Sequence, residues 1–229
     1  MSELPRLSCV LFDIDGTLID TTDLIAAGLQ HAVRKHRGRT PDRARCVELI
    51  GRPLLDQFRL LAGEPVAPLV ADFIRYYERH RHLERVIAEA VALVGLARGL
   101  GLQVGVVTSK NHTELANSLP RLGIAPLLSV AICAGDAPRP KPAPDPILAA
   151  LERLGAEAGR TLYLGDTEWD LQAGRAAGVL TGAAAWAATH PDRLRAAGPD
   201  FWFDRPDQAA DLLRQAAPGP AAPGDPGGR

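Results

Sequence analysis

Short apolar runs alternate with amphipathic segments over most of the chain. The first run, LSCVLF at 7–12, is almost wholly apolar and suits a strand that is buried on both faces. Two shorter runs at 180–186 and 200–203 are predicted as edge strands. Three runs resemble the first and are predicted as further buried strands: 102–108, 127–133 and 161–166.

Helical segments separate these predicted strands. The segment 144–155 has a proline near its start and a glycine at its end, as helix termini prefer. The segment 168–179 contains Gly178 at its end, whereas Pro120 argues against a straight helix through 111–123. Strands that alternate with helices form βαβ units, so we predict a Rossmann-like α/β core with a parallel sheet covered on both faces.

The stretch between the first two predicted strands has a different pattern. Its apolar residues recur at helical spacing, and no strand-like run interrupts them. We therefore assign 19–85 to an inserted all-α cap, and 1–18 together with 86–216 to the α/β core domain. The remainder, 217–229, is rich in proline and glycine and is predicted to be a disordered tail. Helices are expected within the cap at 21–36, 41–50, 53–62 and 66–82.

Composition and charge exclude several classes of protein. The 26 basic and 27 acidic side chains give a net charge of −1, so no general attraction to nucleic acid or an anionic membrane is expected. No window approaches the roughly 20 apolar residues of a membrane span, and no secretory signal is visible, so we expect a cytoplasmic protein. Cys9, Cys46 and Cys133 form no CxxC pair and are predicted to be thiols without a special role, either buried or otherwise indifferent. The histidine spacings predict no zinc site.

Polar residues gather where the predicted strands end. Asp13 and Asp15 follow the first strand in the stretch DIDGT, and Thr108 ends the second. Lys141 lies in the proline-rich loop after the third strand, and Asp166 ends the fourth. Because ligands of open α/β sheets bind beyond the carboxyl ends of the strands, these side chains are expected to converge at one edge.

Each of these features has an ordinary structural explanation when taken alone. An Asp-Gly turn can leave its acids in water, and Asp166 with Asp170 four residues on can compensate a helix dipole. Together, four carboxylates and a lysine would be costly unless a cation and an anion complete the site. Carboxylates without nearby His or Cys suit Mg²⁺, and a carboxylate can attack phosphorus to form an aspartyl phosphate. The set therefore indicates phosphoryl transfer through Asp13.

The motifs DIDGT, VVTSK, Lys141 and GDTEWD, in this order, resemble the phosphatase branch of the haloacid dehalogenase superfamily. The resemblance extends to about residue 216. The position of the helical block is similar to the C1-type cap of phosphoglycolate phosphatases, and LIDTTDLI and IGRPLLDQF are similar to pyrophosphatase members. One departure is the absence, in 84–100, of a Pro-Gly pair that many relatives carry, which concerns the cap–core boundary.

The resemblance implies a division of labour among the acids. Asp13 would be the nucleophile, and Asp15 would first protonate the leaving group and then activate water. Mg²⁺ would be held by the Asp13 carboxylate, the Asp15 backbone carbonyl and Asp166, with Asp170 supporting that metal shell. Asp15 also favours phosphate chemistry over carbon–halogen cleavage, because the dehalogenases of this superfamily lack an acid at this position.

The resemblance assigns the other matching residues to the substrate. Thr108 and Lys141 would hold the transferring phosphoryl group, and Lys141 would offset the charge of the nucleophile. Arg52, in a break between predicted cap helices, either reaches into the cleft or is exposed beside a helix start. His112 follows the second motif and could line the cleft. The predicted substrate-binding residues are Gly16, Thr17, Arg52, Ser109 and Lys110.

These features predict a Mg²⁺-dependent phosphatase for a small phosphorylated metabolite, such as a phosphoglycolate-like ester, or for pyrophosphate, acting as a monomer or homodimer. One alternative is a phosphomutase similar to β-phosphoglucomutase. Thr17 fits the phosphatases better, because those mutases usually carry a branched apolar residue there. The other alternative is a non-catalytic binding protein on the same scaffold. The intact set of motif residues argues against it.

Overall fold

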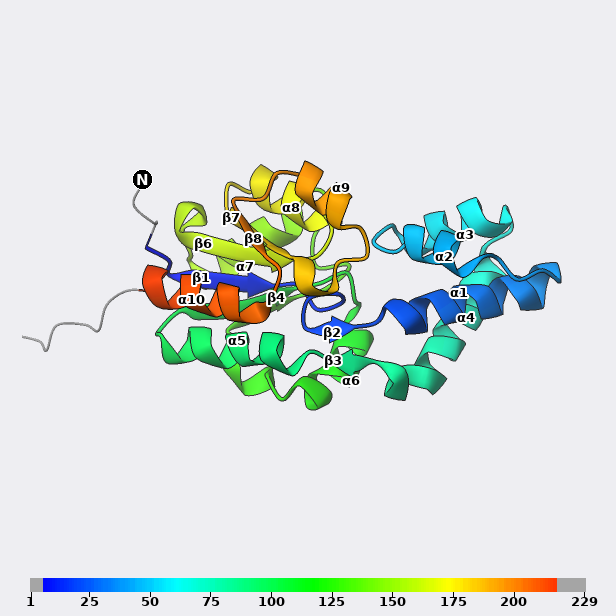
Figure 1. The fold of residues 1–229 in the computed structure, drawn as a ribbon, viewed down its shortest axis with the longest axis horizontal. Helices are drawn as coiled ribbons and strands as arrows, with labels where there is room; N and C mark the ends of the chain where they lie inside the picture. Colours follow the sequence, from blue (N-terminus) through cyan, green and yellow to red (C-terminus); the bar gives the residue numbers. More distant parts are fainter. Residues whose placement is uncertain (1–5, 218–229) are drawn as a thin grey trace, which may run out of the picture.

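A parallel sheet of six strands forms the centre of the core in the computed structural model, which describes residues 6–217 (Figure 1). The spatial order is β5-β4-β1-β6-β7-β8, so the first strand lies in the middle between β4 and β6. The predicted α/β fold with a parallel sheet is confirmed. The strands are β1 (Cys9–Phe12), β4 (Gln103–Val107), β5 (Val130–Ile132), β6 (Thr161–Gly165), β7 (Leu180–Ala184) and β8 (Phe201–Phe203).

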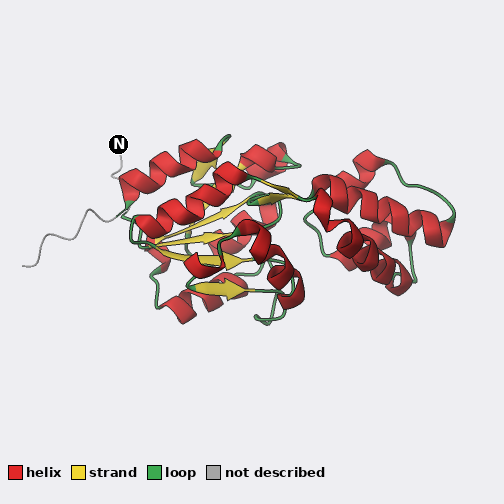
Figure 2. Ribbon diagram, turned by 90° about the horizontal axis from the view of Figure 1, so that it is seen from below, coloured by secondary structure: helices red, strands yellow, loops and turns green. Residues whose placement is uncertain are grey.

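The strands are apolar because helices cover both faces of the sheet (Figure 2). Along β1, Val10 and Phe12 point into one core cluster, while Cys9 and Leu11 point into the other, as the two-residue period of a strand requires. The first cluster is shared with α5 (Ala88–Gly99), α6 (His112–Leu122) and α10 (Pro206–Ala216). The second cluster is shared with α7 (Asp145–Leu154) and α8 (Glu168–Ala176).

The cap consists of helices that pack around an apolar core of their own, beside the core sheet (Figure 1). Phe58 and Phe73 meet edge to face in that core, with ring centroids 6.0 Å apart. Two short strands, β2 (Ile19–Asp20) and β3 (Arg85–Val86), pair antiparallel where the chain enters and leaves the cap. The exact domain boundaries stay a prediction. The cap helices are α1 (Thr22–Arg37), α2 (Arg43–Glu48), α3 (Leu54–Ala62) and α4 (Ala67–His80).

Two sequence-based expectations are wrong. Strand β7 is not an edge strand, because it lies between β6 and β8, and β8 forms this edge of the sheet. Helix α6 continues through Pro120. The proline lies in the last turn, where it removes a single backbone donor, and a capping box between Asn111 and Glu114 fixes the start of the helix. Gly123, with a φ of 66°, then ends it.

Other features of the chain agree with the sequence or lie outside the described part. Cys9, Cys46 and Cys133 are buried free thiols, one of the two predicted alternatives. Between residues 6 and 217, no helix combines the length and apolar character needed to cross a membrane. Apart from Ala217, the predicted tail lies outside the described residues. Helix α9 (Pro191–Ala196) completes the core between β7 and β8.

Candidate active site

A cleft of about 610 Å³ lies where the carboxyl ends of the core strands face the cap. Loops after β1, β4, β5 and β6 supply one wall, and residues of α1, α4 and the α2–α3 break supply the other. The cleft is lined by all the assigned catalytic, metal and substrate residues except Thr17, whose hydroxyl donates to the lining residue Asp166. The convergence expected from the strand ends is therefore present.

Asp13 lies at the end of β1 and is buried, with its backbone N–H donating to the Leu164 carbonyl at 2.8 Å. Its Oδ1 faces the Lys141 ammonium at 3.2 Å but has no hydrogen-bond partner of suitable geometry among the described residues. Burial, opposed by Lys141 and reinforced by Asp170 and Asp15, raises the pKa of Asp13 to about 7. Asp13 Oδ1, the oxygen that could attack an electrophile, is thus held beside Lys141 and accepts no hydrogen bond from the described residues.

Lys141 is fixed by a buried polar network. Its Nζ lies 2.6 Å from Asp170 Oδ1 and donates to the Tyr163 hydroxyl at 3.0 Å. The other Asp170 oxygen accepts from the backbone N–H of Thr167 at 3.0 Å and from its hydroxyl at 2.6 Å. Burial acts to raise the pKa of Asp170, but Lys141 and these hydrogen bonds hold it below its usual value. Both oxygens of Asp170 are occupied, so this residue orients Lys141.

Tyr163 is a member of this network that the sequence interpretation missed. It is fully buried in β6, and its hydroxyl reaches Lys141 and Asp170 from beneath the cleft. The sequence did contain a signal for it, namely the hydroxyl of Tyr163 in the middle of the apolar run TLYLGD. Because a buried hydroxyl needs a partner, such a residue in a central strand points to a polar network nearby.

Asp166 follows β6 and meets the backbone of the β1 loop. Thr17 donates its hydroxyl to Asp166 Oδ1 at 3.3 Å, and Gly16, with a φ of 79°, lies against the other carboxylate oxygen. A Cβ on Gly16 would stand 1.9 Å from Asp166 Oδ2, so only glycine leaves room for the acid. Burial, together with Asp170 and Asp13, raises the pKa of Asp166 well above its usual range.

The chemistry of these acids fits a hard divalent cation. Asp13, Asp166 and Asp170 each place a carboxylate oxygen within 4.8 Å of the others, and all three are buried. Burial is the main cause of the raised pKa of Asp166, and repulsion from Asp170 and Asp13 adds to it, so a bound cation would offset part of the shift. Mg²⁺ prefers carboxylate oxygens as ligands. Among the described residues, Asp13 Oδ1 has no hydrogen-bond partner, so this oxygen is free to bind the ion.

Asp15 and Lys110 form a separate pair on the cap side of the cleft. Lys110 Nζ lies 2.8 Å from Asp15 Oδ1, and only 5% of the lysine side chain is exposed. Lys110 Nζ also donates to the hydroxyl of Tyr77, a residue of α4, at 3.4 Å. Tyr77 in turn donates to buried Glu84, whose other oxygen pairs with Arg121 at 2.8 Å. A polar chain therefore runs from the cap to Asp15, and the substrate role of Lys110 stays a prediction.

The remaining predicted residues lie on the rim of the cleft. The Thr108 hydroxyl accepts from the backbone N–H of Lys110 at 3.2 Å, which fixes the turn after β4, and Ser109 is exposed beside it. Arg52 lies in the α2–α3 break, is exposed, and has no ion pair within residues 6–217. Its guanidinium is therefore available to a ligand in the cleft. His112, the first residue of α6, does not line the cleft. Its ring instead contacts Asp136 in the loop after β5.

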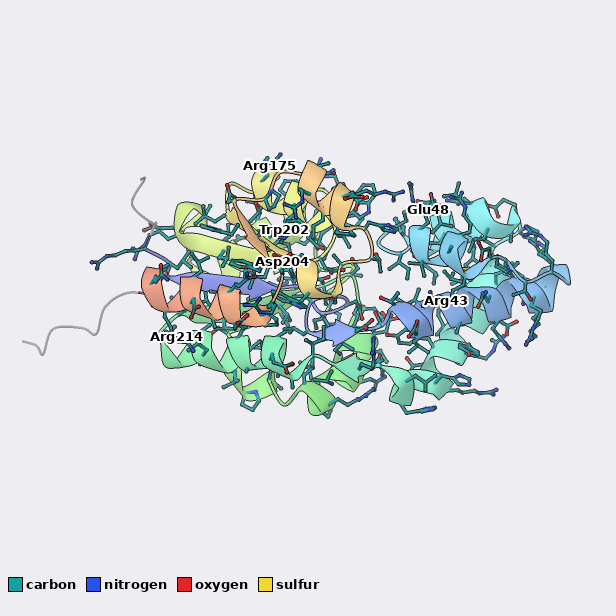
Figure 3. All side chains as sticks on the ribbon, in the orientation of Figure 1. Arg43, Glu48, Arg175, Trp202, Asp204 and Arg214 are labelled. Carbon is teal, nitrogen blue, oxygen red and sulfur yellow. The ribbon has the colours of Figure 1, made fainter. Side chains whose placement is uncertain are left out.

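A second contact joins the cap to the core on the opposite side of the cleft. His190 Nε2 lies 3.1 Å from the carbonyl oxygen of Val47 in α2. Arg193 of α9 approaches Glu48, labelled in Figure 3, at 3.6 Å. The contacts of the cap with the core thus include one through Tyr77 and a separate one through α2.

Comparisons with known proteins agree on one family. Residues 10–184 match the haloacid dehalogenase-like hydrolase family. Pyrophosphatase PpaX of Bacillus velezensis is 30% identical over 91% of this chain and 95% of its own length. The N-acetylmuramic acid 6-phosphate phosphatase of Pseudomonas aeruginosa is 34% identical over 92% of this chain and 96% of its own. The crystal structure of a predicted phosphoglycolate phosphatase from Haemophilus somnus superposes with a TM-score of 0.80, at 21% identity over 91% of this chain and 97% of that one.

Proposed function

The chain belongs to the haloacid dehalogenase-like hydrolase family, and from this premise we propose that it is a Mg²⁺-dependent phosphatase acting through an aspartyl phosphate on Asp13. The observation that carries the proposal is the uncapped Asp13 Oδ1, which faces the Lys141 ammonium in a cleft that Asp15 and Asp166 also line. A nucleophile, a proton carrier, a fixed cation and a metal ligand are thereby gathered around one volume.

The proposed reaction has two steps. A carboxylate oxygen of Asp13 bonds to phosphorus while the bond from phosphorus to the leaving oxygen breaks, and Asp15 gives that oxygen a proton. Asp15 then removes a proton from water, which attacks the aspartyl phosphate, releases inorganic phosphate and restores the Asp13 carboxylate. Lys141 and the Thr108 hydroxyl would hold the phosphoryl oxygens throughout.

The metal would be held by the Asp13 carboxylate, the Asp15 backbone carbonyl and Asp166, with Asp170 supporting it through Lys141 and Thr167. When bound, it supplies positive charge that stabilises the phosphoryl oxygens in the transition state. The chain's own residues prepare for it, since Gly16 leaves space at Asp166 and Thr17 orients that carboxylate.

We propose a small, multiply anionic substrate, either a phosphomonoester of a small metabolite or pyrophosphate. The cleft of about 610 Å³ is bounded on the cap side by the exposed Arg52, and closure of a cap over such a volume excludes bulky substrates. The relatives named above act, by their names, on pyrophosphate and on a phosphorylated amino sugar. The cytoplasmic location and a monomeric or homodimeric state remain part of the proposal.

A phosphate-release screen tests the function. Small phosphomonoesters, hexose phosphates and pyrophosphate are each incubated with the protein, with Mg²⁺ or with a chelator. We expect release that needs Mg²⁺ and falls by at least about 100-fold in the chelator. Release that is equal in both conditions, or no release from any substrate, would overturn the proposal. Transfer of phosphate to a second sugar position, seen in the products, would favour a phosphomutase instead.

Arg52→Ala tests whether the cap contributes to substrate binding. Loss of a charge-assisted contact to a phosphate is expected to raise KM for the preferred substrate about tenfold, with a smaller change in kcat. The matched control is Arg43→Ala, another exposed cap arginine, which pairs with Asp23 and lies outside the cleft. The control should keep KM within about twofold. Equal kinetics in both variants would remove Arg52 from the substrate site.

A further inference from the structure

Three side chains with metal-binding chemistry meet beside the cleft, apart from the buried carboxylates. His112 begins α6, Cys133 directly follows β5, and Asp136 lies three residues further along the same loop. An imidazole nitrogen, the thiol sulfur and a carboxylate oxygen of these residues all lie within 4.8 Å of one another. His112 Nε2 is 2.8 Å from Asp136 Oδ1. Only the fold brings His112 to the other two, which explains why the histidine spacings predicted no zinc site.

We propose that the His112–Cys133–Asp136 cluster binds a thiophilic divalent cation of the Zn²⁺ class. Imidazole nitrogen, thiolate sulfur and carboxylate oxygen are the ligand types of protein zinc sites, and water completes a three-residue set. With bond lengths of about 2.0–2.3 Å, neighbouring ligand atoms of a tetrahedral ion stand about 3.5 Å apart. The separation of 2.8 Å between His112 and Asp136 is shorter than this value, and no separation within the cluster exceeds 4.8 Å. His112 can move to meet the tetrahedral value, because 71% of its side chain is exposed at the helix start.

This cluster and the carboxylates of the active site differ in the ion they favour. Asp13, Asp166 and Asp170 offer only oxygen, which suits the hard Mg²⁺ ion. The second cluster offers sulfur and nitrogen as well, and soft ligands select Zn²⁺ or Co²⁺ over Mg²⁺. Mg²⁺ in excess therefore leaves the His112–Cys133–Asp136 cluster free for a softer ion.

Coordination at the cluster displaces the thiol proton of Cys133. Burial, reinforced by Asp136, raises the pKa of the Cys133 thiol, so the metal-free residue carries its proton at neutral pH. When a sulfur–metal bond forms, the S–H bond breaks and its proton passes to solvent. For His112 to bind through Nε2, the hydrogen that this nitrogen directs at Asp136 must first leave it, and Asp136 would bind as a carboxylate.

The cluster connects two loops that carry active-site residues. Ala134, next to Cys133, donates its backbone N–H to the carbonyl of Lys110 at 2.8 Å. Lys110 follows Thr108 in the loop after β4, and the loop after β5 leads from Cys133 to Lys141. A cation shared by His112 and Cys133 would therefore tie these loops together at the rim of the cleft.

Co²⁺ is the probe for this site, because a thiolate bound to Co²⁺ gives a sulfur-to-metal charge-transfer absorption that oxygen ligands do not give. The full chain is titrated with Co²⁺ in the presence of excess Mg²⁺. We expect the absorption to saturate at one Co²⁺ per chain and to disappear when Zn²⁺ is added, since tetrahedral thiolate sites prefer Zn²⁺. The signal requires sulfur and no turnover, so its result is independent of the proposed phosphatase activity.

Variants assign the signal to the cluster. Cys133→Ser should abolish the absorption, and His112→Ala should weaken Co²⁺ binding by at least about tenfold, since loss of even an outer-shell partner has such an effect. His112 is exposed, so its replacement leaves the fold intact. Cys46→Ser, which removes a buried thiol in the cap, is the matched control and should keep the signal. No absorption, wild-type affinity in His112→Ala, or loss of the signal in Cys46→Ser would each overturn the site.

Discussion

Asp13→Asn is expected to lower the rate of Mg²⁺-dependent phosphate release by about 10⁴-fold or more. The amide has no negative oxygen to attack phosphorus, and removal of a covalent nucleophile leaves only the contribution of binding and transition-state charge. The rate is measured on an aryl phosphate and on the preferred substrate from the screen. Asp204→Asn is the matched control, because it makes the same chemical change on the core surface (Figure 3), where the amide oxygen can still accept from Trp202.

The same variant should fold at least as well as the wild type when Mg²⁺ is removed. The pKa of Asp13 is raised from 3.8 to about 7 by burial, so the native state binds this proton more tightly than the unfolded chain does. The stabilising contribution is full below pH 3.8 and is lost as the pH rises to about 7. At pH 8 without metal, Asp13→Asn should therefore unfold at a higher temperature than the wild type. Wild-type activity in this variant would refute the mechanism, and a collapsed thermal midpoint would refute the origin of the pKa shift.

Gly16→Ala is expected to lower activity by at least about 100-fold without replacing any charged residue. The new Cβ would lie 1.9 Å from Asp166 Oδ2, so the carboxylate must move, and displacement of a ligand by about 1 Å has an effect of this size. Strain at a φ of 79° adds to the clash, and we expect a loss of about 3 kcal/mol in the free energy of unfolding. The rise in thermal midpoint on adding Mg²⁺ should shrink, since that rise reports affinity for the native state.

Gly38→Ala separates the strain from the clash. Gly38 has a φ of 68° at the end of α1, and nothing lies within 4 Å of a Cβ added there. This variant should lose about 1 kcal/mol of stability and keep its activity and its response to Mg²⁺. If Gly16→Ala behaves like Gly38→Ala, the close approach of Gly16 to Asp166 does not serve the site.

The sequence predicted the sheet and the convergence of the acids because both depend on local patterns. An apolar run that ends in Asp13 specifies a buried strand and, with it, the edge at which the side chain emerges. The position of β7 could not be read in this way, because a run of small residues is compatible with either an edge or an interior strand. Pro120 misled for a different reason, since a helical proline removes one hydrogen bond and crowds the preceding turn, and the sequence does not show that burial of Leu115 and Leu122 offsets this cost.

The contacts between distant side chains were beyond the reach of sequence patterns. Lys110 was expected at the substrate, and nothing in VVTSK indicates that Asp15 lies 2.8 Å from its ammonium. Tyr77 reaches the same lysine from a cap helix whose register against the core no local signal encodes. Such pairings are set by the docking of whole elements, so residue type suggests them only after the fold is known.

The antiparallel pairing of β2 with β3 has a consequence for how such a protein can change over time. Ile19 stands opposite Val86, and Asp20 pairs with Arg85, so the chain leaves and rejoins the core at neighbouring points. An insert attached in this way can differ in length without moving the strands that end at Asp13 and Asp166. Under the proposed function, substrate preference and chemistry therefore occupy separate segments of the chain, and exchange of the segment between β2 and β3 is expected to change the ligand and keep the reaction.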